Sequence, residues 1–233
     1  MIPAYIKIRD YLSQQIAKGV IPIHSKLPSE RELVEQFSTT RITAREALSK
    51  LEAAGVIYRS NRRGWFVCPA RLNYDPSSRV NFYQLAQEQG RQAGTHVLKI
   101  KKVKGPADIR QQFNLKSTEK LVELSRVRFL ELRPVLFEKI YLPESLVPDL
   151  SQRDLNGSLT QILKQDYGHV ITQEDNQIKV EAIYDDQAHE LQLNDGSPCL
   201  NIHRKRYAKN GVLIEYDIEY WVHSAIELVI SSR

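Results

Sequence analysis

Two pairs of arginines in this sequence have the spacing expected of anion-binding groups. Arg41 and Arg45 are four residues apart in a segment with helical periodicity, so their side chains lie on one helix face. Arg126 and Arg128 are two residues apart in a segment with strand composition, so their side chains point to one side of a sheet. A guanidinium group donates two parallel hydrogen bonds to a phosphate, phosphonate or carboxylate. We therefore consider DNA for the first pair and a small anion for the second.

The segment Leu27–Val67 contains the elements that would position the first pair. Ser29, followed three residues later by Glu32, forms a capping box that predicts a helix starting at about residue 30. Thr40 can cap a second helix that begins at Arg41. The two helices are separated by only a few polar residues, which is typical of a helix-turn-helix.

The second helix has an apolar side and a polar side. At helical spacing, we expect four side chains to point inward: Ile42, Ala47, Leu48 and Leu51. Four polar side chains are left largely outside: Arg41, Thr43, Arg45 and Lys50. Gly55 ends the helix, and two short apolar strands then flank a basic turn at residues 59–64. This order predicts a winged helix-turn-helix, whose exposed polar surface suits the DNA major groove.

The same segment resembles the N-terminal domain of GntR-type bacterial transcription regulators, because caps, apolar positions, arginines and wing occur in the family's order. It departs from the family at Ser38 (usually the turn glycine), at Ala44, at the wing tip 62–64 and at Trp65. The resemblance implies that seven residues contact DNA: Arg31, Thr40, Arg41, Thr43, Arg45, Arg63 and Gly64. Taken without the resemblance, a solvated helix face would be the better account of Arg41 and Arg45.

The distribution of charge supports a division into two domains. The chain has 233 residues and a net charge of +5, and its length favours two domains over one. Residues 1–70 contain 11 Lys and Arg against 6 Asp and Glu, whereas the remaining 163 residues contain 22 of each sign. All of the excess positive charge therefore lies in the expected DNA-binding part. A cluster of Pro, Asn, Asp and Ser indicates a linker. We expect a DNA-binding domain at 1–69, a linker at 70–78 and a second domain at 79–233.

Cysteine use and targeting signals favour the cytoplasm. Cys68 and Cys199 are the only cysteines, too few for a disulfide framework or a zinc site. The six histidines are scattered without ligand spacing, so we expect no metal and no cofactor. Residues 4–18 form an amphipathic helix rather than a signal peptide, and no apolar run reaches membrane-spanning length.

The second half has the pattern of an antiparallel sheet with flanking helices. Strand composition recurs at 96–103, 121–130, 135–142, 171–184, 198–208, 212–223 and 225–230. Helices fit at 82–90, 106–113, 158–167 and 186–192. Asn210-Gly211 predicts a hairpin with a type I′ turn. Because the strands are joined by hairpins without regular βαβ alternation, the fold class expected for the whole chain is α+β.

This half resembles the UTRA effector-binding domain of the HutC branch of GntR regulators, which has a chorismate-lyase-like fold. The resemblance covers residues 78–230 and rests on the stretches 125–128, 135–143, 157–159, 210–211 and 214–216. Segments such as NFYQLAQEQGR and DIEYWVHS look like the regulators of phosphonate utilisation in that branch. Val222-His223-Ser224 departs from the Arg-Gly-Asp of many relatives. The resemblance implies ligand contacts at Arg126, Arg128, Glu138, Ser158 and Glu215.

The residues themselves add candidates to this effector site. Glu138 could accept a hydrogen bond from an amine or hydroxyl of the ligand whose anion binds Arg126 and Arg128. The starts of two expected helices offer backbone N–H groups to an anion. They contain Asn81, Phe82 and Tyr83 in one case, and Ser158 and Thr160 in the other. The alternative is that the strand arginines form a solvated face, paired with glutamates such as Glu123 or Glu131.

Two functions from different classes fit these observations. The first is a ligand-responsive transcription regulator, which we expect to be a homodimeric repressor of double-stranded operator DNA released by a small anionic effector, such as a phosphonate or a phosphorylated compound. The second is a chorismate-lyase-like enzyme acting on a small acid. The sequence lacks a nucleophile–base pair or a glycine-rich phosphate loop, and a fold alone does not confer activity. The winged helix-turn-helix favours the regulator.

Overall fold

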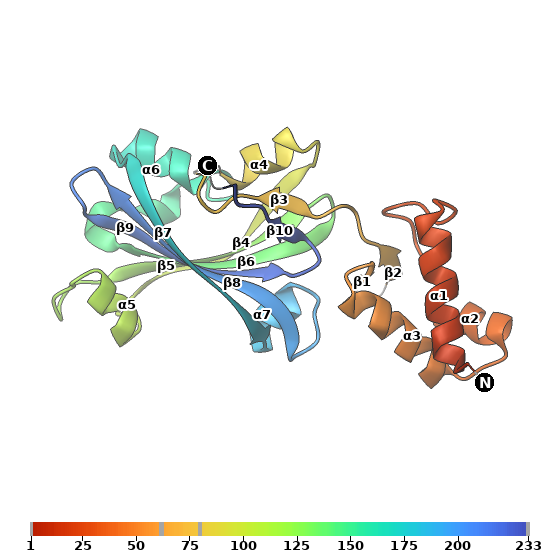
Figure 1. Cartoon of the computed structure of the whole chain (residues 1–233). Helices are drawn as coiled ribbons and strands as arrows, with labels where there is room; N and C mark the ends of the chain where they lie inside the picture. Colours follow the sequence, from red (N-terminus) through yellow and green to blue (C-terminus); the bar gives the residue numbers. More distant parts are fainter. Residues whose placement is uncertain (1, 61–62, 79–80, 232–233) are drawn as a thin grey trace. The chain divides into compact units, whose positions relative to one another are not determined.

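The computed structural model describes residues 2–60, 63–78 and 81–231 (Figure 1). The chain divides into two compact units. The first comprises Met1–Arg71 with His223–Glu227, and the second comprises Leu72–Val222 with Leu228–Arg233. Residues 70–78, where we expected a linker, contain strand β3 (Leu72–Tyr74). In the part of the chain that is described, no helix is long and apolar enough to cross a membrane.

The first unit is a three-helix domain with a short hairpin. Its elements are α1 (Ala4–Ala17), α2 (Glu30–Phe37), α3 (Arg41–Ala53), β1 (Ile57–Ser60) and β2 (Gly64–Val67). The two strands pair antiparallel, with Ile57 opposite Val67 and Ser60 opposite Gly64. A continuous apolar core joins the helices to the hairpin; it includes Ile8, Leu12, Leu33, Leu48, Ile57 and Trp65. These elements confirm the predicted winged helix-turn-helix.

The helix starts follow the capping signals in the sequence. The Ser29 side chain accepts a hydrogen bond from the Glu32 N–H, and the Glu32 carboxylate accepts one from the Ser29 N–H, which confirms the capping box. Thr40 caps α3 by accepting from the Thr43 N–H. Between the helices, Ser38 has a φ of 47° and a ψ of 52°, the left-handed conformation in which glycine is usually found. The turn therefore holds a serine in a strained backbone position.

One predicted core position of α3 is wrong. Ile42 is 81% exposed, whereas Ala44, which we did not place in the core, is completely buried. A helix advances by about 100° per residue, so Ala44, Ala47, Leu48 and Leu51 fall within one sector. Ile42 falls on the opposite side, because it precedes Ala44 by two residues rather than by three or four.

The second unit is built on a six-stranded antiparallel sheet in the order β4-β5-β6-β9-β8-β7. The strands are β4 (Ala93–Val103), β5 (Leu121–Leu130), β6 (Arg133–Pro143), β7 (Ile171–Ile183), β8 (Ser197–Ala208) and β9 (Leu213–Val222). The short strand β10 (Ile226–Leu228) pairs with β3 in a separate two-stranded sheet. This antiparallel architecture confirms the predicted α+β fold class.

Helices cover both faces of the large sheet (Figure 1). On one face lie α4 (Phe82–Glu88) and α6 (Leu159–Tyr167), and on the other lie α5 (Ala107–Gln112) and α7 (Asp185–Glu190). Two short 3-10 helices, Glu144–Leu146 and Leu150–Gln152, follow β6. The core under α6 joins Leu159 and Leu163 to Leu124 and Ile140 of the sheet. The core under α5 includes Ile109 and Tyr141.

The hairpin between β8 and β9 forms at the predicted place but with a different turn. Gly211 has a φ of +77°, whereas Asn210 has a negative φ, and a type I′ turn requires positive values at both residues. The Gly211 N–H donates to the Ala208 carbonyl, and the Ala208 N–H donates to the Val212 carbonyl. The type I′ prediction is wrong because a longer loop needs only its last residue, Gly211, in the left-handed region.

Candidate functional site

A buried ion-paired arginine pair lies at the centre of the sheet, on the face covered by α4 and α6. Arg126 is 1% exposed and Arg128 is 6% exposed, so they do not form the solvated face that we considered as an alternative. Glu138 lies directly opposite Arg126 in the register of β5 with β6. One Glu138 oxygen accepts from Arg126 Nε at 3.0 Å, and the other accepts from Arg128 Nε at 2.7 Å. Glu138 thus separates two guanidiniums that would otherwise repel each other.

The charge of Glu138 follows from this arrangement. Burial alone would raise the pKa of Glu138, but Arg126 and Arg128 stabilise the carboxylate and lower its pKa to about 2. The carboxylate is therefore ionised at neutral pH. We expected Glu138 to accept from a ligand, but in this structure both of its oxygens already accept from arginines. Its immediate role is that of an internal counter-ion.

The two arginines also hold the walls of the site. Arg126 Nη1 donates to the carbonyls of Leu155 and Gly157, at 3.3 Å and 3.4 Å, and so fixes the loop that precedes α6. Arg128 Nη1 lies 3.3 Å from Thr95 Oγ1, and its guanidinium lies 5.1 Å from the centre of the Phe82 ring. Arg128 is therefore held between the sheet and the first turn of α4.

A second arginine pair lies on the same face of the sheet and was missed in the sequence. Arg204 of β8 contacts Glu219 at 2.8 Å and Glu174 at 3.4 Å. Arg206 contacts Glu174 at 3.0 Å and Glu215 at 2.8 Å. A signal was present, because basic residues at 204 and 206 and acidic residues at 215, 217 and 219 alternate on two strands of one predicted hairpin. Opposite charges in such strands pair across the hairpin.

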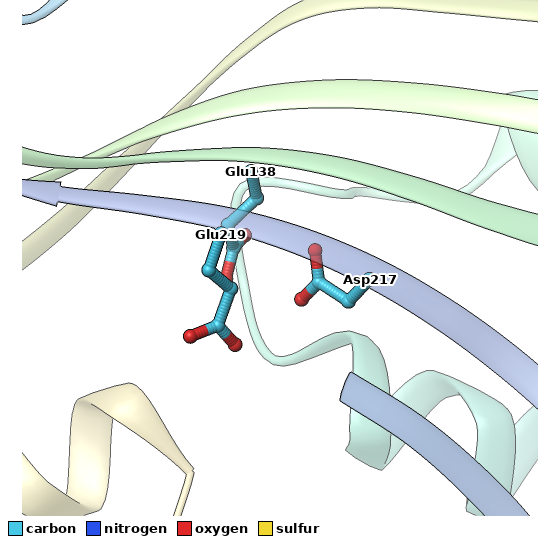
Figure 2. A group of neighbouring side chains, drawn as sticks. All are labelled: Glu138, Asp217 and Glu219. Atoms are coloured by element: carbon cyan, nitrogen blue, oxygen red, sulfur yellow. The ribbon is translucent and has the colours of Figure 1, made fainter. Parts of the chain in front are cut away.

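Figure 2 shows Glu138, Asp217 and Glu219 projecting to the same side of the sheet. Carboxylate oxygens of the three residues lie within 4.8 Å of one another, and all three side chains are buried. Arginines neutralise Glu138 and Glu219. One oxygen of Asp217 finds no hydrogen-bond partner among the described residues. Burial, followed by the charges of Glu138, Glu219 and Glu215, raises the pKa of Asp217 well above its usual value. Of the three carboxyl groups, Asp217 is therefore the one whose surroundings favour the protonated form.

The two arginine pairs, with Glu138 and Glu219, surround a small cavity of about 40 Å³. A single water molecule needs roughly 10–15 Å³ on this measure, so the cavity has room for a compact chemical group. Its walls comprise aromatic, charged and hydroxyl-bearing side chains: Tyr74, Phe82, Tyr83, Trp221, Arg126, Arg128, Arg204, Arg206, Glu138, Glu219, Asn81, Ser158 and Thr160, with Leu85, Leu136 and Leu159. All of the residues predicted for the effector site line this cavity except Glu215. Their role in ligand binding stays a prediction.

The starts of two helices reach the cavity, as expected. Asn81 caps α4 by accepting from the Gln84 N–H, and Ser158 caps α6 by accepting from the Gln161 N–H. The side-chain oxygens of Asn81 and Ser158 therefore already accept hydrogen bonds from backbone N–H groups of the protein. The first turn of an α-helix has N–H groups without helical partners, and these favour an anion. In the nine-residue α6 this end carries Ser158 and Thr160 into the cavity wall. Glu215, by contrast, is completely buried and accepts from Arg206.

The residues predicted to contact DNA lie in the helix-turn-helix and the hairpin of the first unit. Arg31, Arg41 and Arg45 are exposed on α2 and α3. Arg31 forms an ion pair with Glu35, and Arg45 forms one with Glu30 at 3.0 Å. The Arg45–Glu30 ion pair joins the two helices. It lowers the pKa of Glu30, chiefly through the hydrogen bond with Arg45.

The hydroxyl residues and the wing complete the predicted set. The Thr40 and Thr43 hydroxyls lie 3.0 Å apart at the start of α3. The exposed Arg63 places its guanidinium 5.2 Å from the centre of the Phe66 ring. Gly64 has a φ of +108°, and an added Cβ would approach Lys26 Cε to 3.0 Å, so a side chain is disfavoured there. The wing residues Asn61 and Arg62 lie outside the described residues.

Comparison with known proteins bears on both units. The model of the bacterial regulatory proteins of the gntR family matches residues 4–67, and the UTRA domain model matches residues 88–227. The chain belongs to the UTRA-containing GntR family of transcription regulators. The predicted family and fold class are thereby confirmed, and proteins of this family are transcription regulators rather than enzymes. The enzyme alternative is therefore dropped.

Three similar proteins illustrate the match. The chain is 28% identical to the uncharacterized HTH-type transcriptional regulator YihL of Escherichia coli over 224 residues, covering 96% of this chain and 95% of YihL. It is 26% identical to the HTH-type transcriptional repressor NagR of Bacillus subtilis, covering 92% and 88% of the two chains. The crystal structure of PhnF from Mycobacterium smegmatis superposes with a TM-score of 0.68 at 22% identity, covering 97% and 99%. The PhnF match concerns the fold alone.

Proposed function

We propose that this GntR-family protein is a repressor whose operator binding is controlled by a small anionic metabolite held in the cavity of its UTRA domain. The observation that carries this proposal is the arginine-lined cavity of the second unit, in a chain whose first unit is a winged helix-turn-helix. A repressor is favoured because the similar protein NagR is named as one. The DNA contacts would come from α3 and the wing.

The cavity favours a ligand with a compact anionic group. Four arginines line it, and the start of α6 adds the Ser158 and Thr160 hydroxyls and the N–H groups of a first helical turn. A phosphonate or phosphate group suits this donor set, because its three oxygens accept several hydrogen bonds at once. The volume of about 40 Å³ fits such a group better than a large ring system.

The rest of the ligand would meet acceptors and aromatic rings. Glu219 lines the cavity beside the arginines, and its carboxylate can accept a hydrogen bond from an ammonium or hydroxyl group. Phe82, Tyr83 and Trp221 supply apolar walls. An aminoalkylphosphonate combines a compact anion with an amine and is our first candidate, and a phosphosugar, which offers hydroxyls instead, is the second.

Regulators of this kind gain specificity by binding as pairs. One winged helix has a small footprint, and a homodimer doubles it on a palindromic site. We propose a homodimer that binds an imperfect palindrome of double-stranded DNA in the cytoplasm, with the second unit providing both the effector site and the dimer contact. Footprinting and sedimentation would show two protected half-sites and twice the chain mass. A monomer on one asymmetric site would contradict this.

The effector proposal is tested by calorimetry beside a gel-shift release assay on the full chain. The probes are 2-aminoethylphosphonate, a hexose 6-phosphate and inorganic phosphate. We expect the wild type to bind one of the first two and to leave DNA when it does. Arg128→Gln should lose both effects, and Thr160→Val, which removes one hydroxyl and no charge, should weaken them.

A matched variant controls for unspecific effects of losing an arginine. Arg153 pairs with Asp166 on the surface of the same unit, and its side chain is 47% exposed. Arg153→Gln should therefore behave like the wild type. If the wild type binds none of the three probes, or if Arg128→Gln and Arg153→Gln respond alike, the cavity is not the anion site that we propose.

A further inference from the structure

Ile42 is an apolar side chain in an unexpected place. It is 81% exposed, whereas four other apolar side chains of α3 are buried: Ala44, Ala47, Leu48 and Leu51. Single exposed apolar residues are common on proteins and need no explanation by themselves. Ile42 differs from these because it belongs to the helix that carries Arg41 and Arg45, and it lies in the first turn of that helix.

The position of Ile42 around the helix follows from the buried stripe. With about 100° per residue, the four buried residues of α3 centre on one direction, and Ile42 points almost opposite to it. Arg45 and Ser49 lie three and seven residues further along and share this outward stripe. Arg41 is at its edge. The outward side of the helix therefore carries Ile42, Glu46 and Ser49, with Arg45 beside them.

We infer that Ile42 reads the methyl group of a thymine in the operator. This inference rests on the proposal that α3 enters the major groove. In that groove only thymine presents an apolar group, its C5 methyl, and the other base edges present donors and acceptors. An isoleucine has no hydrogen-bonding atoms in its side chain, so it can bury a methyl but leaves a polar base edge without a partner. It therefore favours thymine and disfavours cytosine at the base that it meets.

The expected arrangement on the half-site is simple. Arg45, one turn from Ile42, would donate to a guanine or a phosphate, and Ile42 would cover a thymine close to that position. In the free protein Arg45 is paired with Glu30 of α2, so contact with DNA would compete with this ion pair. The operator half-site should thus contain a thymine whose methyl contributes to binding.

Replacing thymine by uracil tests this directly, because uracil lacks only the methyl and pairs in the same way. Operators are first selected from a random duplex library with the full-length protein. Each thymine of the selected half-site is then replaced by uracil. We expect one replacement per half-site to weaken binding by roughly fourfold, the factor that corresponds to burying one methyl group. The affinity of Ile42→Ser should not change when uracil replaces thymine at that position.

The chain offers a matched control in the same unit. Ile23 is 62% exposed and lies outside α3, so Ile23→Ser removes the same apolar group elsewhere and should read DNA like the wild type. The proposal is overturned if no uracil replacement weakens operator binding by the wild type. It is also overturned if the same replacement reduces the affinity of Ile42→Ser as much as that of the wild type. If Arg45→Ala and Ile42→Ser both select the wild-type sequence, then α3 does not read the operator, and the proposed DNA contact fails instead.

Discussion

The Tyr74 hydroxyl accepts a hydrogen bond of 2.7 Å from the Arg204 guanidinium, although 130 positions separate the two residues in sequence. Tyr74 lies on β3, with which the chain enters the second unit, and its ring stacks on Trp221 of β9. Arg204 also contacts Glu219, which accepts from the Trp221 indole. The strand nearest in sequence to the DNA-binding unit is thus bonded to the wall of the cavity.

Tyr74→Phe should destabilise the second unit, because it removes the hydroxyl partner of a buried arginine. Hydrogen bonds to charged groups contribute about 1.5–3 kcal/mol, so a loss of that size is expected near pH 8. Urea unfolding, followed by the fluorescence of Trp221 in a Trp65→Phe background, would measure it. An unchanged free energy of unfolding would show that water replaces the tyrosine hydroxyl.

The same variant makes a prediction about alkaline pH. Burial raises the pKa of Tyr74 to about 12, from an ordinary value near 10. Above pH 10 the unfolded chain releases the proton while the folded protein keeps it, so the stability that Tyr74 contributes is complete below pH 10 and is lost as pH rises towards 12. The full loss would be about 3 kcal/mol. The difference between wild type and Tyr74→Phe should therefore shrink above pH 10, and parallel stability curves would contradict this.

Asp217→Asn should raise the stability of the protein at neutral pH. The pKa of Asp217 is raised by burial and by the neighbouring carboxylates, so the folded protein holds a proton that the unfolded chain has released above about pH 4. The folded state is penalised increasingly as pH rises from there, and asparagine removes the penalty. The advantage of the variant should decline as pH falls towards 4. A variant that is less stable at pH 7 would contradict the protonated state of Asp217.

Glu138→Gln should be strongly destabilising, because it leaves Arg126 and Arg128 buried without their common counter-ion. Breaking a buried ion pair typically costs about 3–5 kcal/mol. A control is Glu123→Gln, because Glu123 pairs with the half-exposed Lys101 on the neighbouring strand, where about 1 kcal/mol or less is expected. Similar losses for the two variants, measured by thermal unfolding, would show that Glu138 is not a special counter-ion.

Arg45→Ala and Arg63→Ala should separate base reading from phosphate contact. If Arg45 reads a base, its loss should weaken operator binding by about 1–3 kcal/mol per subunit and relax the sequence preference. Loss of Arg63 should mainly reduce affinity and the slope of affinity against salt, because wing contacts are largely to the backbone. Binding to operator and random duplexes at several salt concentrations distinguishes them. Equal losses on both duplexes for both variants would show that neither residue reads sequence.

Ser38→Gly should stabilise the first unit. Ser38 adopts a left-handed conformation, which costs a residue with a Cβ about 1–2 kcal/mol, and glycine avoids most of this cost. Ser49→Gly, in the exposed part of α3, should have the opposite sign and destabilise by about 0.5–1 kcal/mol. Thermal unfolding monitored by Trp65 fluorescence compares the two. A Ser38→Gly protein that melts below the wild type would show that the serine hydroxyl stabilises the turn.

The elements of this chain could be predicted from the sequence because their signals are local. The capping box of Ser29 and Glu32 lies within one helical turn, and the strands of the second unit are marked by composition and by turn residues such as Gly211. The arginine pair at Arg126 and Arg128 was likewise found from its spacing of two. Spacing indicates that side chains share a face, but it does not indicate what that face meets.

The tertiary structure alone decided which charges meet. Glu138 lies opposite Arg126, and Arg206 lies opposite Glu215, because of strand register, and register depends on contacts between residues far apart in sequence. The protonation of Asp217 follows from burial among other carboxylates, which no local pattern encodes. The exposure of Ile42 also depends on tertiary structure, since a helix can have several apolar stripes and only packing against its neighbours selects the buried one.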